Sequence, residues 1–419
     1  MSAAASGLDR TIRVVPALLA AALLFACGGG GGGASEAPRA VPLAAPVERG
    51  TLLQATWSAY PRLVRLSHQA DSRRNGTIVA SVTENLNGVW QAGFHASVDD
   101  GARFQRVGAL VDVEFAKGLC CGTLFELPQA VGSIAAGTLL YAASVGADAA
   151  GALMAQRIYR SDDAGATFRR IDGAYCGRSS VPRSPGGAGS GIWEPEFLVA
   201  ADGSLACIYS DETEPGRSQV LKLTATRDGV AWSTPHVIVA GAASSDRPGM
   251  AVVRKLPSGR YAMSFENCSA ARLDCAVRLK LSDDGLDWGA VGTLGARPET
   301  AAGQYFRHAP TLAWTTVAGQ PRGVLALIGQ IVSADNAGVD VSGSGRVLFV
   351  DDSGEGGGEW RMVPAPIGLQ SAPTVTNWCQ NYSTPLLPSA DGAQILLMQT
   401  DGTAEGGCAA RFGRGRLSP

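Results

Sequence analysis

One short motif recurs along this chain and constrains its fold more than any other feature. It is a turn that contains Asp and Gly and is followed closely by an aromatic residue, and its five copies occupy residues 97–104, 161–168, 225–232, 281–288 and 351–360. The glycines of the copies lie at 101, 165, 229, 285 and 354, so the steps between copies are 64, 64, 56 and 69 residues. A period near 60 residues with one such turn per unit indicates radial or solenoid repetition of a single structural unit.

Short apolar runs between the turns predict strands and an all-β chain. In the fourth unit the runs are 250–256, 261–265 and 276–281, and the 54 Gly and 22 Pro of the 419 residues fit the turns between them. A sixth unit, at 384–412, lacks the Asp-Gly turn, and residues 51–57 from the other end of the chain are expected to supply its fourth strand. This pairing would join the first and last units and remove a free sheet edge.

The repeated octets resemble the Asp-box of sialidase-like β-propellers. In such a turn the Asp side chain accepts hydrogen bonds from backbone N–H groups, Gly supplies a positive φ, and the aromatic residue folds back onto the blade. The resemblance implies a six-bladed β-propeller made of four-stranded antiparallel blades. Six blades of roughly 60 residues each fit one propeller over residues 49–419.

The first 48 residues are not expected to belong to the propeller. Arg10 and Arg13 precede an apolar run at 14–25, which is too short to cross a bilayer and has the length of a signal-peptide core. The run ends in Leu-Phe-Ala-Cys27 and resembles a bacterial lipobox, so we expect residues 1–26 to be a lipoprotein signal peptide. Residues 27–48 would then be a lipidated cysteine with a Gly-rich tether.

This reading places the protein at the bacterial cell envelope, on the outer membrane or the cell surface, with the lipid as its only contact with the membrane. The alternative is an ordinary secretory signal with an unmodified Cys27 and a secreted product. In both cases the chain is exported, and the eight remaining cysteines predict disulfides. Cys268–Cys275 and Cys379–Cys408 are the expected pairs.

Composition argues against several other kinds of partner. The formal net charge is −2, which does not favour a basic nucleic-acid-binding surface. The four histidines are scattered, and no paired Cys-x-x-Cys motif occurs, so neither a metal nor a cofactor is expected. We expect a monomer whose partner is an oligosaccharide or polysaccharide.

The motifs that carry chemistry lie where strands should reach the centre of the ring. They are Trp193-Glu194-Pro195, Arg247-Pro-Gly-Met, and Glu266 at the end of the following strand. Together they resemble the exo-arabinanases of glycoside hydrolase family 93, six-bladed propellers that release short arabinose units from α-1,5-arabinan. The resemblance names Glu194 and Glu266 as the catalytic carboxylate pair and Tyr382 as a tyrosine close to them. Two carboxylates, one protonating the leaving oxygen and one attacking or activating water, are what glycoside hydrolysis requires.

The remaining site candidates are residues that could contact the substrate, and three of them have a structural alternative. Arg62 and Arg247 could instead form salt bridges with the central glutamates, and Trp193 could pack inside a blade rather than stack on a sugar. Glu196 is expected on the same strand face as Glu194, but deeper. The substrate-binding candidates are Arg62, Trp193, Arg247, Tyr305 and Arg307.

Two other functions remain open from the sequence. An exo-α-sialidase would hold its substrate carboxylate with three central arginines, but Glu266 stands where one of them belongs and would repel that group. A non-catalytic carbohydrate-binding propeller would have no need for two central carboxylates. The exo-1,5-α-L-arabinanase-like glycoside hydrolase is therefore the preferred hypothesis.

Overall fold

The computed structural model describes residues 48–187, 189–269, 272–317, 319–334, 338–340, 343–370, 373–374 and 377–417. The predicted signal peptide, Cys27 and nearly all of the tether lie outside the described residues. Within the described part, none of the helices is long and apolar enough to cross a membrane. Helix is confined there to two short 3-10 turns, η1 (Ser72–Arg74) and η2 (Val113–Lys117).

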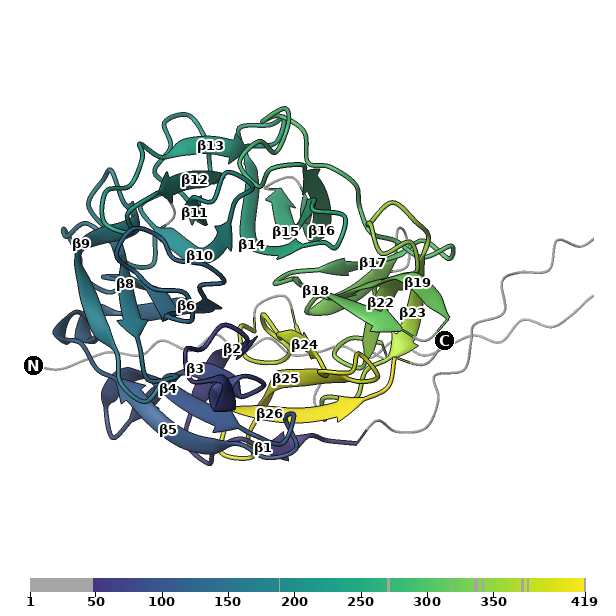
Figure 1. Cartoon of the computed structure of the whole chain (residues 1–419). Coiled ribbons are helices and arrows are strands. Elements are labelled where there is room, and N and C mark those ends of the chain that lie inside the picture. Colours follow the sequence, from purple (N-terminus) through teal and green to yellow (C-terminus); the bar gives the residue numbers. More distant parts are fainter. Residues whose placement is uncertain are drawn as a thin grey trace, which may run out of the picture. The chain divides into compact units, whose positions relative to one another are not determined.

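The described residues form six antiparallel β-sheets arranged as blades around a centre, which confirms the predicted six-bladed propeller (Figure 1). In each blade the first strand lies innermost, and these inner strands contact one another around the ring. The first three blades have the strand order in which they occur in the chain. Their strands are β2 (Ser58–Arg65), β3 (Ile78–Leu86), β4 (Val89–Ser97) and β5 (Gln105–Leu110); β6 (Leu119–Glu126), β7 (Leu139–Val145), β8 (Ala155–Ser161) and β9 (Arg169–Arg178); β10 (Ile192–Val199), β11 (Leu205–Asp211), β12 (Val220–Thr226) and β13 (His236–Val239).

The fourth blade departs from the four-strand pattern. Beyond its third strand the sheet continues into three short strands that come from two different parts of the chain. Its strands are β14 (Asp246–Lys255), β15 (Tyr261–Ser269), β16 (Arg272–Ser282), β17 (Gln304–Arg307), β20 (Ile331–Ala334) and β21 (Gly338–Asp340). The fifth blade contains β18 (Thr311–Val317), β19 (Gln320–Ile328), β22 (Val347–Asp351) and β23 (Trp360–Pro364).

The two ends of the propeller meet in the sixth blade, as the sequence predicts. Its strands are β24 (Leu386–Pro388), β25 (Ile395–Gly402), β26 (Cys408–Gly415) and, from the start of the domain, β1 (Thr51–Leu52). Thr51 pairs with Phe412 and Leu52 with Arg411, and Figure 1 shows the purple β1 beside the yellow β26. This pairing closes the ring, so β26 has no open edge at that position.

The Asp-Gly turns have the hydrogen bonds that the residue types predict. In the second blade, Asp163 Oδ1 accepts from the Thr167 N–H at 2.9 Å, and Gly165 has a φ of 92°. The aromatic residue of that turn, Phe168, stacks on Phe94 of the neighbouring blade with ring centroids 4.1 Å apart. The turn aromatics therefore add to the contacts between blades.

The hydrophobic core lies between neighbouring blades rather than in one central mass. Buried clusters join blades one and two, two and three, three and four, and one and six, and the largest joins blades four, five and six. Because inner strands are covered on both faces, they are predominantly buried along their length. The centre of the ring is consequently held by rigid walls.

Four disulfides connect the eight cysteines of the domain. Cys268–Cys275 and Cys379–Cys408 are the two predicted pairs, and Cys176–Cys207 joins the second and third blades. Cys120 and Cys121, adjacent in sequence, form the fourth disulfide.

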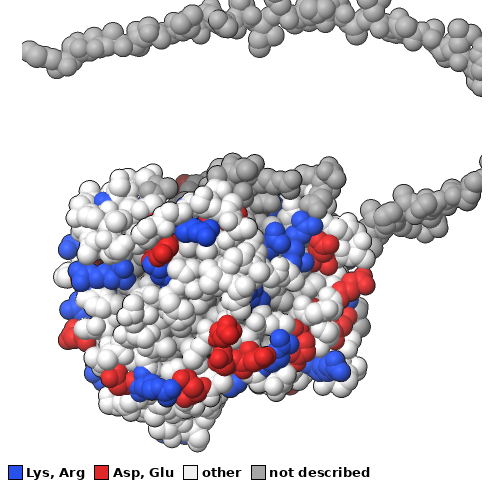
Figure 2. Space-filling view, turned by 90° about the horizontal axis from the view of Figure 1, so that it is seen from above, with Lys and Arg blue, Asp and Glu red and all other residues white. Residues whose placement is uncertain are grey.

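The side of the molecule in Figure 2 mixes basic and acidic groups without a patch of one sign.

Candidate active site

A cavity of about 460 Å³ lies at the centre of the ring, and we call it the hub cavity. It is formed where inner strands begin and second strands end, which is where the sequence placed the candidate residues. Its lining combines carboxylates, aromatic side chains and a disulfide. The lining residues are Trp57, Ala59, Tyr60, Thr83, Trp90, Leu119, Cys120, Cys121, Trp193, Glu194, Glu212, Gln219, Arg247, Glu266, Cys268, Trp378 and Tyr382.

A repeated backbone irregularity brings several of these side chains to the centre. The first four inner strands each contain a β-bulge, and one residue in each bulge has a left-handed φ between 51° and 63°. Bulges re-aim side chains and are frequent beside active sites, and such φ values cost energy for residues other than Gly. The left-handed residues are Tyr60, Cys121, Glu194 and Met250.

The bulge in β10 corrects one expectation from the sequence. Glu196 follows Glu194 by two residues and should share its strand face, but the bulge between Trp193 and Glu196 breaks the alternation. Glu194 lines the hub cavity, whereas Glu196 lines a separate cavity formed by later residues of the inner strands. Glu196 also accepts hydrogen bonds from Thr123 and Arg254. It does not belong to the hub cavity.

Glu194 is held in the hub cavity by two hydrogen bonds. Its Oε2 accepts from the Ser210 hydroxyl at 2.6 Å and from the Met250 N–H at 3.0 Å. Burial raises the pKa of Glu194 above its ordinary value, the two hydrogen bonds oppose that rise, and repulsion from Glu212 adds to it. Because both donors favour the ionised form, Glu194 is the better placed of the two candidate glutamates to carry a negative charge.

Glu266 stands at the end of the second strand of the fourth blade and is only 9% exposed. Its Oε2 accepts from the Ala309 N–H at 2.7 Å. Burial, together with repulsion from Glu194, raises the pKa of Glu266 to about 8, while the Ala309 N–H and the charge of Arg247 oppose this rise. The surroundings of Glu266 therefore favour its protonated form.

His308 is a neighbour of Glu266 that the sequence did not single out. Its Nδ1 lies 3.8 Å from Glu266 Oε2, and burial, with repulsion from Arg307, lowers the pKa of His308 to about 4. A neutral His308 cannot neutralise Glu266. Among the described residues, neither Glu194 nor Glu266 forms an ion pair with Lys or Arg, in contrast to Glu196.

Two tyrosines complete the centre of the hub cavity. The Tyr60 and Tyr382 ring centroids are 6.4 Å apart. Burial, followed by repulsion from Glu266 and Glu194, raises the pKa of Tyr382 well above its ordinary value. The structure thus brings Tyr382 close to both carboxylates, and it adds Tyr60, whose pKa is also raised by burial.

The two arginine candidates have different positions. Arg62 does not line the hub cavity but lines the cavity that contains Glu196. Its guanidinium lies 4.2 Å from the centre of the Tyr60 ring and donates to the Ser383 carbonyl. Arg247 does line the hub cavity, but donates to Glu212 at 2.6 Å and to Gln219 at 2.8 Å. Glu212 and Gln219 are therefore cavity residues that the sequence analysis missed. Arg247 forms its salt bridge with Glu212 and not with Glu194 or Glu266, the central glutamates that were its expected structural partners.

Of the other three substrate-contact candidates, one lines the hub cavity and two do not. Trp193 lines the hub cavity, with the Arg183 guanidinium 5.1 Å from its ring centre. Tyr305 and Arg307 do not line it, because their strand β17 pairs with β20 at the outer part of the fourth blade. Tyr305 is buried against Arg297 instead.

The aromatic rim of the hub cavity was also missed. Trp57, Trp90 and Trp378 come from widely separated parts of the chain, and Trp57 contacts both of the others, with ring centroids 5.2 and 5.7 Å apart. The adjacent Cys120–Cys121 disulfide forms another part of the wall. These residues converge only in the folded ring, so no local signal could have identified them.

One group of side chains has the residue types of a metal site. Ligand atoms of Glu266, Cys268, Cys275 and His308 all lie within 4.8 Å of one another. The two cysteines are joined to each other, so their sulfurs are not thiolates. Only two usable ligands remain, fewer than the three or four protein ligands of a zinc site.

The comparisons with known proteins identify the same fold. No family model matches the chain, and no curated protein matches it. An α-L-arabinanase of Penicillium chrysogenum, solved with arabinobiose, is 22% identical, with 89% of this chain and 99% of that one covered and a TM-score of 0.71. The glycoside hydrolase family 93 α-L-arabinofuranosidase of Fusarium graminearum, also solved with arabinobiose, is 20% identical, with 88% and 98% covered and a TM-score of 0.71.

A more distant structural relative is a Hadza microbial sialidase, which is 13% identical, with 86% of this chain and 66% of that one covered and a TM-score of 0.55. At these identities the likeness establishes the six-bladed fold. The chemistry of this chain has to be argued from its own cavity.

Proposed function

We propose that this protein is an exported glycoside hydrolase that cleaves glycosidic bonds in the hub cavity with Glu194 and Glu266, in the manner of an exo-1,5-α-L-arabinanase. The observation that carries the proposal is a pair of buried carboxyl groups in one cavity, neither with a Lys or Arg ion-pair partner among the described residues. Burying such groups is costly, and a structural role would be served better by a paired carboxylate.

The two carboxyl groups differ in the way that the reaction requires. Glu266, with its pKa raised to about 8, holds a proton that it can give to the glycosidic oxygen as the C–O bond breaks. Glu194, with two donors on one oxygen, is the carboxylate that attacks the sugar carbon or takes a proton from the attacking water. The Tyr382 phenol, whose pKa responds to both carboxyl groups, is placed to stabilise the positively charged transition state.

The charges of the hub cavity favour a neutral sugar over sialic acid. Among the described residues, its lining contains three glutamates and one arginine, Arg247, which already pairs with Glu212. Arg62, a candidate for holding a substrate carboxylate, does not line the hub cavity. An anionic substrate would meet uncompensated negative charge. The arabinobiose in the Penicillium and Fusarium structures supports a neutral arabino-oligosaccharide.

The decisive experiment is a substrate panel of debranched arabinan, sialyl-lactose and aryl glycosides, with product analysis and with Glu194→Gln and Glu266→Gln as matched inactive controls. We expect short arabinose products from arabinan and none from either variant. Release of sialic acid would replace the proposal by the sialidase alternative. Binding of arabinan without turnover by the parent would favour the non-catalytic binding module.

Export through a lipid anchor is a separate part of the proposal and rests on the sequence around Cys27. Metabolic labelling with a fatty acid in a bacterial host should mark the parent chain but not Cys27→Ser. Equal labelling of the two, or labelling of neither, would leave an ordinary secretory signal as the explanation.

A further inference from the structure

A second hollow, of about 790 Å³, adjoins the hub cavity over the sixth blade, and we call it the blade-6 shelf. Trp57 and Trp378 line both spaces, so the two indoles stand at their common boundary. Trp378 is 57% exposed, unusually high for a large aromatic side chain. The shelf is lined by Arg49, Trp57, Gln370, Thr374, Asn377, Trp378, Cys379, Gln380, Gly402, Thr403, Ala404, Gly406, Gly407 and Cys408.

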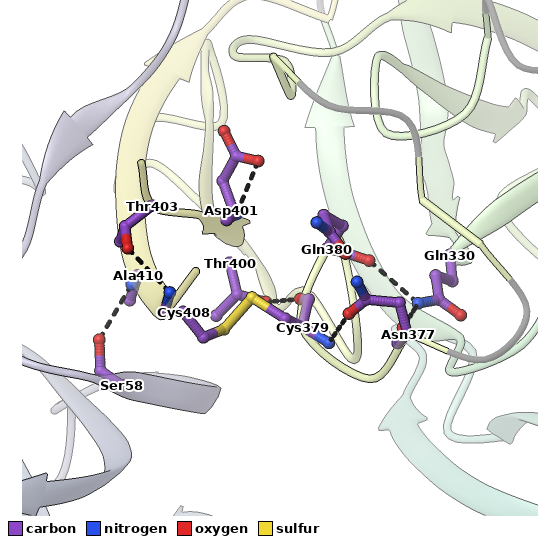
Figure 3. Close-up of a disulfide and its surroundings, with 12 residues drawn as sticks. Ser58, Gln330, Asn377, Cys379, Gln380, Thr400, Asp401, Thr403, Cys408 and Ala410 are labelled. Carbon is purple, nitrogen blue, oxygen red and sulfur yellow. Dashed lines mark hydrogen bonds between the residues drawn. A yellow bond between two sulfur atoms is a disulfide. The ribbon is translucent and has the colours of Figure 1, made fainter. Parts of the chain in front are cut away.

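The loop that carries Trp378 is fixed at several points (Figure 3). The Cys379–Cys408 disulfide ties it to β26, and Thr400 of β25 donates to the Cys379 carbonyl. From the other side, the buried amide of Gln330 donates to the Gln380 carbonyl at 3.0 Å and to the Asn377 carbonyl. An exposed tryptophan on a loop pinned from both sides is preorganised, so binding on it costs little ordering entropy.

The chemistry of the shelf fits a sugar chain. Its aromatic faces are those of Trp57 and Trp378, against which the C–H groups of a sugar ring can pack. Around them stand amide and hydroxyl side chains, among them Asn377 and Thr403, which match sugar hydroxyls. The lining contains no carboxylate among the described residues, and its one charged side chain, Arg49, is paired with Asp401.

We propose that the blade-6 shelf binds the distal residues of an oligosaccharide whose reacting end occupies the hub cavity, with Trp378 as the platform that carries the chain out of the centre. This inference rests on the proposed function, because it takes the substrate class from the hub cavity. It adds where the protein binds the part of the chain that lies beyond the reacting end.

The test compares short and long ligands in a protein that cannot cleave them. Dissociation constants of arabinobiose and arabinohexaose are measured by calorimetry for Glu266→Gln and for the double variant Glu266→Gln/Trp378→Ala. The Glu266→Gln protein should bind the hexaose about tenfold more tightly than the biose. The double variant Glu266→Gln/Trp378→Ala should lose that gain in affinity. Trp378→Phe should keep part of it, and Val98→Ala, an exposed apolar side chain that lines neither space, should keep all of it.

The outcomes distinguish a failure of the shelf proposal from a failure of the proposed function. Binding of the biose with no gain for the hexaose, or a gain that survives Trp378→Ala, overturns the shelf and leaves the proposed function standing. Failure of the Glu266→Gln background to bind either ligand, together with inactivity of the parent enzyme on arabinan, overturns both. Thermal melting of each variant shows that any lost affinity does not come from unfolding.

Discussion

Two cavities at the centre of the propeller differ in how they surround two neighbouring glutamates, Glu194 and Glu196. The hub cavity contains Glu194 and Glu266 without Lys or Arg partners among the described residues. The other cavity, of about 610 Å³, lies among later residues of the inner strands and contains Glu196, which pairs with Arg254 at 3.1 Å and also accepts from Thr123. We call it the opposite mouth.

Glu194 and Glu196 make this contrast within one strand, two residues apart. Pairing stabilises Glu196 as an ordinary structural carboxylate, whereas burial without a cation raises the pKa of Glu194. Perturbed carboxyl groups in a cavity are a mark of catalytic sites, and satisfied ones are a mark of structural networks. The proposed function therefore predicts that catalysis takes place in the hub cavity and not in the opposite mouth.

The largest effect expected from this comparison is on turnover. Glu194→Gln or Glu266→Gln should each lower kcat/KM at least about 100-fold, because a positioned acid or base is lost. Glu196→Gln should change it by less than about threefold, since its partners lie in the other cavity. Steady-state kinetics on arabinan-derived substrates measure this, and an equal loss in Glu196→Gln would remove the distinction between the mouths.

The second expected effect is on the pH dependence of kcat/KM. Activity should fall as pH rises through about 8, where Glu266 loses its proton, and should fall on the acid side at a pH above the usual 4.5 of a glutamate, where Glu194 gains one. Ser210→Ala removes a hydrogen bond that favours the Glu194 carboxylate, so the acid limb should move to higher pH. An unmoved acid limb would mean that Glu194 is not the group that titrates.

The smallest expected effect is on stability. Replacing Glu by Gln should stabilise the protein in the hub cavity and destabilise it in the opposite mouth. The folded state binds the Glu266 proton more tightly than the unfolded state does, so stability is lost as pH rises from 4.5 through about 8. Glu266→Gln should therefore raise the melting temperature at pH 9 by about 3 °C and have less effect at pH 5.

Glu196→Gln provides the matched change in the opposite mouth. It breaks the pair with Arg254 and should cost about 1 to 2 kcal/mol, lowering the melting temperature at pH 9 as well as at pH 7. Thermal melts at the three pH values measure both variants. If Glu196→Gln instead raised the melting temperature, the pair between Glu196 and Arg254 would be destabilising rather than stabilising.

The sequence predicted the number of blades, their closure and their strands well because these features depend on local sequence patterns. An Asp-Gly turn forms from neighbouring residues, as Asp163 and Thr167 show, and its repetition every 60 residues or so set the number of blades. Closure through residues 51–57 followed from the need to complete the last sheet. The strand ends that carry Glu194 and Glu266 followed from the same patterns.

The details of the site could not be predicted in this way. Neither Glu nor Tyr is a residue that signals a left-handed backbone, so the bulges at Glu194 and Tyr60 left no mark in the sequence pattern. The pattern therefore put Glu196 beside Glu194, and it offered Tyr305 and Arg307 as substrate contacts although β17 pairs with β20 and neither residue lines the hub cavity.

The sequence by itself determined that the chain is an all-β, six-bladed ring with glutamates near its centre, because turn chemistry and strand patterning act over a few residues. Only the tertiary structure decided which carboxylates are left without a cation, and that Trp57 and Trp378, more than 300 residues apart, share one boundary. The reason is that burial, charge pairing and aromatic contact depend on which distant segments of the chain lie side by side. Closure of the ring determines which segments these are.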